Sequence, residues 1–110
     1  MLGRAGVVQL TATLVERSMV RYSPAGVPVL ECLLDHRSTQ QEANLLRLVE
    51  FEIRALALGD IVTQLSRVAP GSELAVEGFL APSRKASKTL LLHITGFAPA
   101  SRTDIDTVPN

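Results

Sequence analysis

A tightly constrained turn separates two strand-like runs in the first third of the chain. Residues 23–26 read Ser-Pro-Ala-Gly. Proline fixes φ at about −65° and glycine allows a positive φ, so Pro24 and Gly26 favour a sharp reversal of the chain. The run VVQLTATLV (7–15) precedes the reversal and PVLECLLD (28–35) follows it. Because polar and apolar residues alternate in the first run, this pattern predicts a long β-hairpin.

The rest of the chain alternates between further strand-like runs and one helical segment. The polar stretch HRSTQQEAN (36–44) predicts a loop after the second strand. Asp60 can cap a helix, and apolar residues recur after it at helical spacing, which predicts a short helix over about 61–67. Three more strands are predicted over 45–54, 73–81 and 89–97.

This order of elements predicts the fold class. Five strands with one helical connection after the third match the order of the OB-fold. We therefore predict an all-β, five-stranded OB-fold barrel with a short helical segment between strands 3 and 4. Hydrophobic residues make up 46% of the 110 residues, which is enough for one core. The OB-fold domain is predicted to span 1–100, and the polar residues 101–110 are predicted to form a flexible C-terminal tail.

The charge and cysteine content limit how the protein could bind nucleic acid and in which cellular compartment it is expected. Eleven basic residues balance eleven acidic residues, so any binding of nucleic acid must come from an uneven distribution of charge. The single cysteine, Cys32, lies in an apolar run and is predicted to be a small buried hydrophobe. No signal peptide or membrane span is recognised in the sequence. We expect a cytoplasmic protein that does not contact a membrane.

The residues needed for catalysis do not form a recognisable set. His36 and His93 are the two histidines, and His93 is expected to be a partly exposed strand residue. No metal-ligand spacing, phosphate-binding loop or nucleophile motif is found. Glu50 and Glu52 share a strand face and are interpreted as a solubilising surface. The chain is therefore predicted not to be an enzyme, with no cofactor, metal or small-molecule substrate.

A basic turn is the strongest candidate for binding. The stretch SRKASK carries Arg84, Lys85 and Lys88 and no acid. In an OB-fold the loop between strands four and five borders the oligonucleotide groove, where flexible cations can neutralise phosphates. Further candidate contacts are Arg21 and Tyr22 at the tip of the first hairpin, Arg37 after the second strand and Arg47 in the third.

Aromatic residues, which stack on bases in many single-strand binders, are few here. The chain has four aromatic residues and no tryptophan. Tyr22 is the one expected to be an exposed stacking residue. Phe51 is placed on the inward face of its strand, and Phe79 and Phe97 are assigned to the core. The predicted affinity for nucleic acid is therefore modest and sensitive to salt.

The residues following the first turn carry a family resemblance. The stretch SPAGVPVLECLLDHRSTQQEAN resembles the S-P-x-G-(I/V)-P…L-x-H-x-S-x-Q-x-E motif of the primosomal replication protein N (PriB) family. RYSPAG is also similar to the first hairpin of bacterial single-stranded-DNA-binding proteins. VEGFLA and LLLHITGF resemble the last two strands of the PriB family. The resemblance covers about residues 7–98.

The resemblance implies a function. Members of this family are OB-fold homodimers, paired through the first strand, that act in replication restart. They bind single-stranded DNA, stabilise the helicase PriA on its substrate and help to recruit DnaT. By position, the DNA-contacting cations of the family fall on Arg21, Arg37, Arg84 and Lys88. Leu45 and Glu50 stand where some members carry aromatic residues, which implies a weaker DNA groove here.

Three alternatives to a DNA-binding primosome accessory protein remain open from the sequence. The first is a protein-interaction module with little DNA affinity, which Glu50 and the zero net charge favour. The second is a general single-strand coating protein, although the residues after Pro99 lack the long acidic tail of such proteins. The third is an RNA-binding OB domain, because phosphate-neutralising cations distinguish the two sugars poorly.

Overall fold

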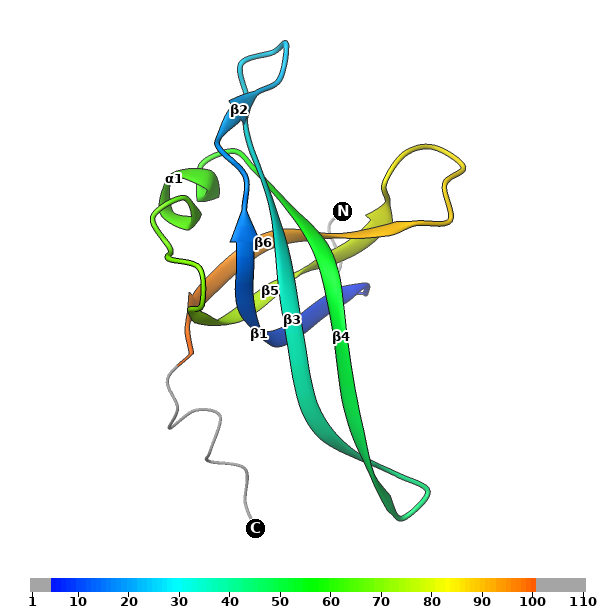
Figure 1. The fold of residues 1–110 in the computed structure, drawn as a ribbon. Coiled ribbons are helices and arrows are strands. Elements are labelled where there is room, and N and C mark those ends of the chain that lie inside the picture. Colours follow the sequence, from blue (N-terminus) through cyan, green and yellow to red (C-terminus); the bar gives the residue numbers. More distant parts are fainter. Residues whose placement is uncertain (1–4, 101–110) are drawn as a thin grey trace.

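A computed structural model describes residues 5–100 of the chain, and these residues form mostly β-structure (Figure 1). The tail predicted for 101–110 lies outside the described residues. The elements in chain order are β1 (Val7–Arg17), β2 (Arg21–Tyr22), β3 (Pro28–Glu42), β4 (Leu45–Leu58), α1 (Ile61–Leu65), β5 (Glu73–Pro82) and β6 (Leu90–Pro99).

The strands form one six-stranded sheet that closes on itself. The order is β1-β5-β6-β4-β3-β2, and an additional pairing joins β1 to β3. The β4–β6 pair is parallel and the other pairs are antiparallel. Thr13 takes part in both pairings of β1, opposite Glu73 of β5 and Asp35 of β3. An irregularity between Leu14 and Glu16 bends β1 from one partner to the other, as β-bulges do.

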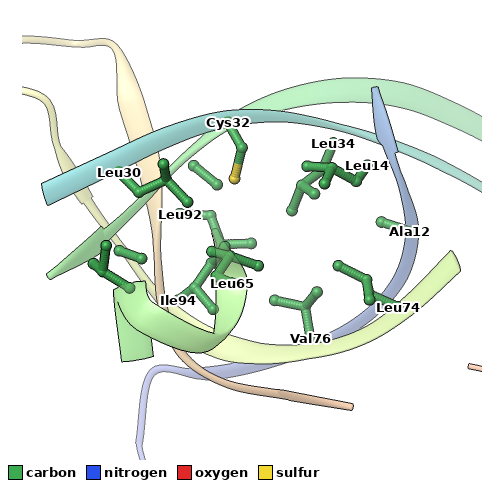
Figure 2. Packing of buried hydrophobic residues seen from close by; sticks show 13 residues of the cluster. Ala12, Leu14, Leu30, Cys32, Leu34, Leu65, Leu74, Val76, Leu92 and Ile94 are labelled. Carbon is green, nitrogen blue, oxygen red and sulfur yellow. The ribbon is translucent and has the colours of Figure 1, made fainter. Parts of the chain in front are cut away.

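The core lies inside this closed sheet (Figure 2). Alternate residues of β3 point inward, and Leu30, Cys32 and Leu34 are buried there. Leu65 reaches in from α1 and is fully buried, so the helix contributes to the same core. Cys32 is 3% exposed, which confirms its predicted place as a small buried hydrophobe.

The structure confirms the hairpin turn and shortens the helix. Ser23 accepts a backbone hydrogen bond of 2.8 Å from Gly26, and Gly26 has a φ of 83°. The two-residue strand β2 pairs with the start of β3 beside this turn, which adds a sixth, very short strand to the five predicted. Helix α1 follows β4 in the chain and begins at Ile61 as expected. It ends at Leu65 rather than near residue 67.

The loop predicted over residues 36–44 is wrong. Strand β3 continues to Glu42 and pairs with β4 without a break, from Val29 opposite Leu58 to Glu42 opposite Leu45. Ala43 and Asn44 have φ values of 53° and 66°, so they close a two-residue hairpin turn of the kind that matches strand twist. Beyond Asp35, β3 has β4 as its one described partner strand, so this part protrudes from the sheet, and residues 39–48 around its tip are all exposed. The stretch is polar for that reason.

His36 anchors the base of this protrusion. Its Nδ1 lies 2.7 Å from the backbone oxygen of Thr11, and its Nε2 lies 2.8 Å from the Ser38 hydroxyl. The ring also packs against Phe51, with centroids 4.9 Å apart. The whole β3–β4 pair is here called the β3–β4 ribbon (Pro28–Leu58). The buried His36 side chain therefore links the base of the protruding part of this ribbon to strand β1.

Candidate nucleic-acid interface

Arg37 lies on the outer face of the β3–β4 ribbon and is paired with an acid. The register places Arg37 directly opposite Glu50, and the guanidinium lies 2.6 Å from the carboxylate. The next position along the same face pairs Asp35 with Glu52. Both members of the ion pair are largely exposed, so the pair contributes about 0–1 kcal/mol to stability. Its larger consequence is that the charge of Arg37 is already balanced where a phosphate would have to approach.

Arg21 and Tyr22 lie in β2, at the end of the molecule formed by the first turn (Figure 1). The Tyr22 side chain is 69% exposed, in agreement with its predicted role as an accessible ring. The guanidinium of Arg21 forms an ion pair with Glu31 of β3. A second predicted cation is thus held by a neighbouring carboxylate.

Arg47 lies at the opposite end of the ribbon. It forms an ion pair of 3.0 Å with Glu42 across the hairpin turn. Residue Gln40 is its register partner, whereas Tyr22 is opposite Pro28. From Pro28 to Gln40, β3 spans roughly 40 Å at about 3.3 Å per residue. The structure therefore does not bring Arg47 and Tyr22 into one cluster.

The remaining predicted cations lie in the loop between β5 and β6, here called the basic loop (residues 83–89). Among residues 5–100, no carboxylate lies within ion-pair distance of Arg84, Lys85 or Lys88. The loop is closed by a 2.8 Å hydrogen bond from the Ser83 backbone N–H to the Thr89 carbonyl. All three cations are exposed, so their charge is available to an anion.

The aromatic residues are placed differently from the sequence-based assignment. Phe97 packs against the core, as expected. Phe51 and Phe79 are 40% and 43% exposed, so the assignment of Phe79 to the core is wrong. Phe51 faces the inner side of the ribbon, but it lies beyond the closed part of the sheet. Phe79 faces outward and stacks on His93, which is half-buried as predicted for a strand histidine.

A simple sequence signal could have shown that Phe79 faces outward. In β5, Leu74 and Val76 are buried and Gly78 is buried with them, so the even positions face the core. Strand alternation then places residue 79 on the outer face. The apolar neighbours of Phe79 in the sequence obscured this alternation.

Cys32 is a free, buried cysteine. Burial raises the pKa of the Cys32 thiol to about 11, which keeps it protonated near neutral pH. Within residues 5–100, no group of three or more His, Cys, Asp or Glu side chains is arranged to hold a metal ion. None of the helices in that range is long and apolar enough to cross a membrane. The geometry is that of a closed β-sheet with solvent-facing loops and side chains available for contacts.

Comparison with known proteins identifies the class to which this geometry belongs. A family model described as "another single-strand binding protein family" matches residues 7–96. The single-stranded DNA binding protein of Thermus aquaticus has the same fold, with a TM-score of 0.68 over 86% of this chain and 50% of that protein, at 24% identity. The chain therefore belongs to the single-strand binding protein class.

Closer relatives define the family within this class. Replication restart protein PriB of Bordetella pertussis is 45% identical over 79% of this chain and 81% of its own length. That of Neisseria gonorrhoeae is 37% identical over 84% and 92%, respectively. The solved structure of PriB from Ralstonia solanacearum superposes with a TM-score of 0.80 at 47% identity, over 87% and 98%. The chain belongs to the PriB family, which confirms the resemblance seen in the sequence.

Proposed function

We propose that this protein is a replication-restart primosome accessory protein that binds single-stranded DNA and stimulates or bridges the helicase PriA and DnaT. Its membership of the PriB family over most of its length is the observation that carries the proposal. The exposed basic loop supports the DNA-binding part, because Arg84, Lys85 and Lys88 are available for phosphates. The protein acts by binding and is not an enzyme.

The proposed architecture is the OB-fold barrel, with α1 between its third and fourth long strands. Residues 1–100 form its single domain and 101–110 a C-terminal tail, and the protein acts in the cytoplasm. In this proposal DNA runs over β3 and β4, the basic loop and the turn beside β2, which correspond to the elements with which OB-folds bind oligonucleotides. Candidate contacts with DNA remain the seven predicted residues: Arg21, Tyr22, Arg37, Arg47, Arg84, Lys85 and Lys88.

The proposed assembly is a homodimer paired through β1. From Val7 to Ala12, β1 pairs with β5 on one edge and with no described strand on the other. Leu14 exchanges backbone hydrogen bonds with Ser72 and Gly71 on the β5 side, so odd-numbered residues such as Gln9 direct their N–H to the free edge. Replacement of Gln9 by proline should yield monomers in light-scattering measurements, whereas an unchanged mass would reject this edge as the dimer contact.

Two measurements test the proposed function. Fluorescence anisotropy with labelled oligo-dT should show binding at low salt that weakens as salt is raised. An unwinding assay with the cognate PriA should show stimulation when the protein is added. Failure of both would reject the proposal.

A second candidate is a protein-interaction module with little DNA affinity. It is favoured by the ion pairs of Arg21, Arg37 and Arg47, which leave these predicted contacts already neutralised. Stimulation of PriA without oligo-dT binding at tens of micromolar protein would support this candidate over the first.

A further inference from the structure

An exposed aromatic stack lies on the outer face of β5 and β6. Phe79 and His93 are register partners, with ring centroids 4.9 Å apart and planes 8° from parallel. A Cβ at the preceding residue, Gly78, would overlap the backbone carbonyl of His93. The glycine therefore lets the two strands come close enough for the rings to stack.

The stack lies in the centre of an apolar row that crosses four strands. Val7 of β1 is opposite Phe79, and His93 is opposite Leu56 of β4. All four side chains are at least partly accessible. Beside the stack is a shallow pocket of about 110 Å³, lined by Leu56, Leu58, Phe79, His93, Ile94 and Thr95. A flat apolar ring could enter this pocket and contact the aromatic pair.

The surrounding charge indicates what would bind there. From Gly78 to Thr95 the chain carries Arg84, Lys85 and Lys88 and no acid. The basic loop begins beyond the pair Pro82–Leu90, which lies three residues, or roughly 10 Å, along the hairpin from Phe79 and His93. Glu77 lies on the other side of the stack, away from this loop. An occupant with a flat ring and an adjacent negative charge matches both features.

We infer that the outer face of β5 and β6 is a base-stacking site for single-stranded DNA, in which a base seated in the pocket stacks against the Phe79–His93 pair while the basic loop holds neighbouring phosphates. This inference rests on the proposed DNA-binding function and assigns the stacking contact to a surface outside the predicted set of residues. It explains how the protein could stack on bases although Leu45 and Glu50 of β4 are not aromatic, because the stacking surface lies on β5 and β6 instead.

A fluorescence experiment locates the stacked base directly. The chain contains no tryptophan, so Phe79→Trp introduces a single reporter at the proposed site. Addition of oligo-dT should quench its emission, because stacked bases quench indole. Leu48→Trp is the matched control on the exposed part of the β3–β4 ribbon and should be quenched much less. Equal quenching at both positions, or quenching at position 48 alone, would overturn the inference.

An affinity measurement separates stacking from phosphate contacts. Phe79→Leu keeps an apolar side chain but removes the aromatic ring, and its melting temperature reports whether the fold is intact. Oligo-dT should bind this variant roughly five- to tenfold more weakly than the wild type, whereas an abasic oligonucleotide of equal length should bind both equally.

The outcomes distinguish this inference from the function on which it rests. Salt-sensitive binding of oligo-dT to the wild type with no loss in Phe79→Leu would overturn the stacking site and leave the proposed function intact. No binding of either oligonucleotide to the wild type would reject the DNA-binding function and the stacking site together. If Phe79→Leu changes the mass of the protein in solution but not its affinity for DNA, this face is a contact between copies of the chain, and the inference is overturned.

Discussion

The β3–β4 ribbon and the β5–β6 hairpin are both long antiparallel pairs, but they differ in the sign of their net charge and in whether their cations are in ion pairs. The strands of the ribbon carry five acids and three arginines, a net charge of −2, and two of the arginines are in ion pairs within it. The hairpin from Glu73 to Pro99 carries two acids and three cations, a net charge of +1, and the cations are concentrated in one loop. An anion therefore meets accessible positive charge at the hairpin and a net negative charge at the ribbon.

The two regions also differ in their apolar surface. The ribbon exposes Leu45, Leu46 and Leu48 near its tip, which are aliphatic side chains that stack poorly on bases. The hairpin exposes Phe79, stacked on His93. Cross-strand acids therefore neutralise two of the cations that the sequence places on the ribbon, Arg37 and Arg47.

Gly78→Ala should have the largest effect, because it removes the geometry of the hairpin. The added methyl group would overlap the His93 carbonyl, a backbone atom that cannot move without shifting β6. We expect a loss of about 2–3 kcal/mol in the free energy of unfolding, measured by urea denaturation. Gly96→Ala is the matched control on β6, where a Cβ meets no atom within 4 Å, and it should leave stability nearly unchanged. Equal effects at both positions would contradict the close approach at Gly78.

Removal of the loop cations should have the next largest effect and tests the contrast in charge. The triple change of Arg84, Lys85 and Lys88 to Ala should weaken oligo-dT binding roughly tenfold or more at low salt. It should also lower the salt slope of log K by about 2, since each lost phosphate contact on a single strand contributes about 0.7. Stability should change little, because all three side chains are exposed.

A matched triple change removes the paired arginines of β2 and the ribbon. Replacement of Arg21, Arg37 and Arg47 by Ala removes the same number of charges, each already paired with a carboxylate. We expect a smaller loss of affinity than from the loop variant, measured by anisotropy over the same series of salt concentrations. A larger loss would mean that DNA displaces the carboxylates and that β2 and the ribbon together form the main phosphate-binding surface.

Glu50→Gln should have the smallest effect, and it tests whether the ion pair of Arg37 limits DNA binding at the ribbon. The substitution keeps the shape of the side chain but frees Arg37 and removes a repulsive charge. We expect oligo-dT affinity to rise about two- to threefold, with a stability change below about 1 kcal/mol. Glu42→Gln frees Arg47 at the tip in the same way. A gain at residue 50 but not at residue 42 would place the path of the DNA across the base of the ribbon.

Local features of the sequence were sufficient to predict several features of the segments that line the core. The turn around Pro24 and Gly26, the buried Cys32 and the start of α1 at Ile61 all follow from local backbone preferences or from periodic burial. Likewise, the motif from Ser23 to Glu42 was enough to identify the PriB family. These properties depend on residue types that are near one another in the chain.

The remaining features could not be predicted from the sequence, because the residue pattern of one strand does not show which residues of another strand it pairs with. Residues 36–42 read as a loop because both faces are polar, and only the register with β4 makes them a strand. The same register brings Glu50 to Arg37, so charges that were free in the sequence become balanced. The stacking of Phe79 on His93 depends on Gly78, which lets β6 approach β5 closely. Local residue patterns thus predict most of the core, whereas contacts across strands set which charges are paired and which rings stack on the surface.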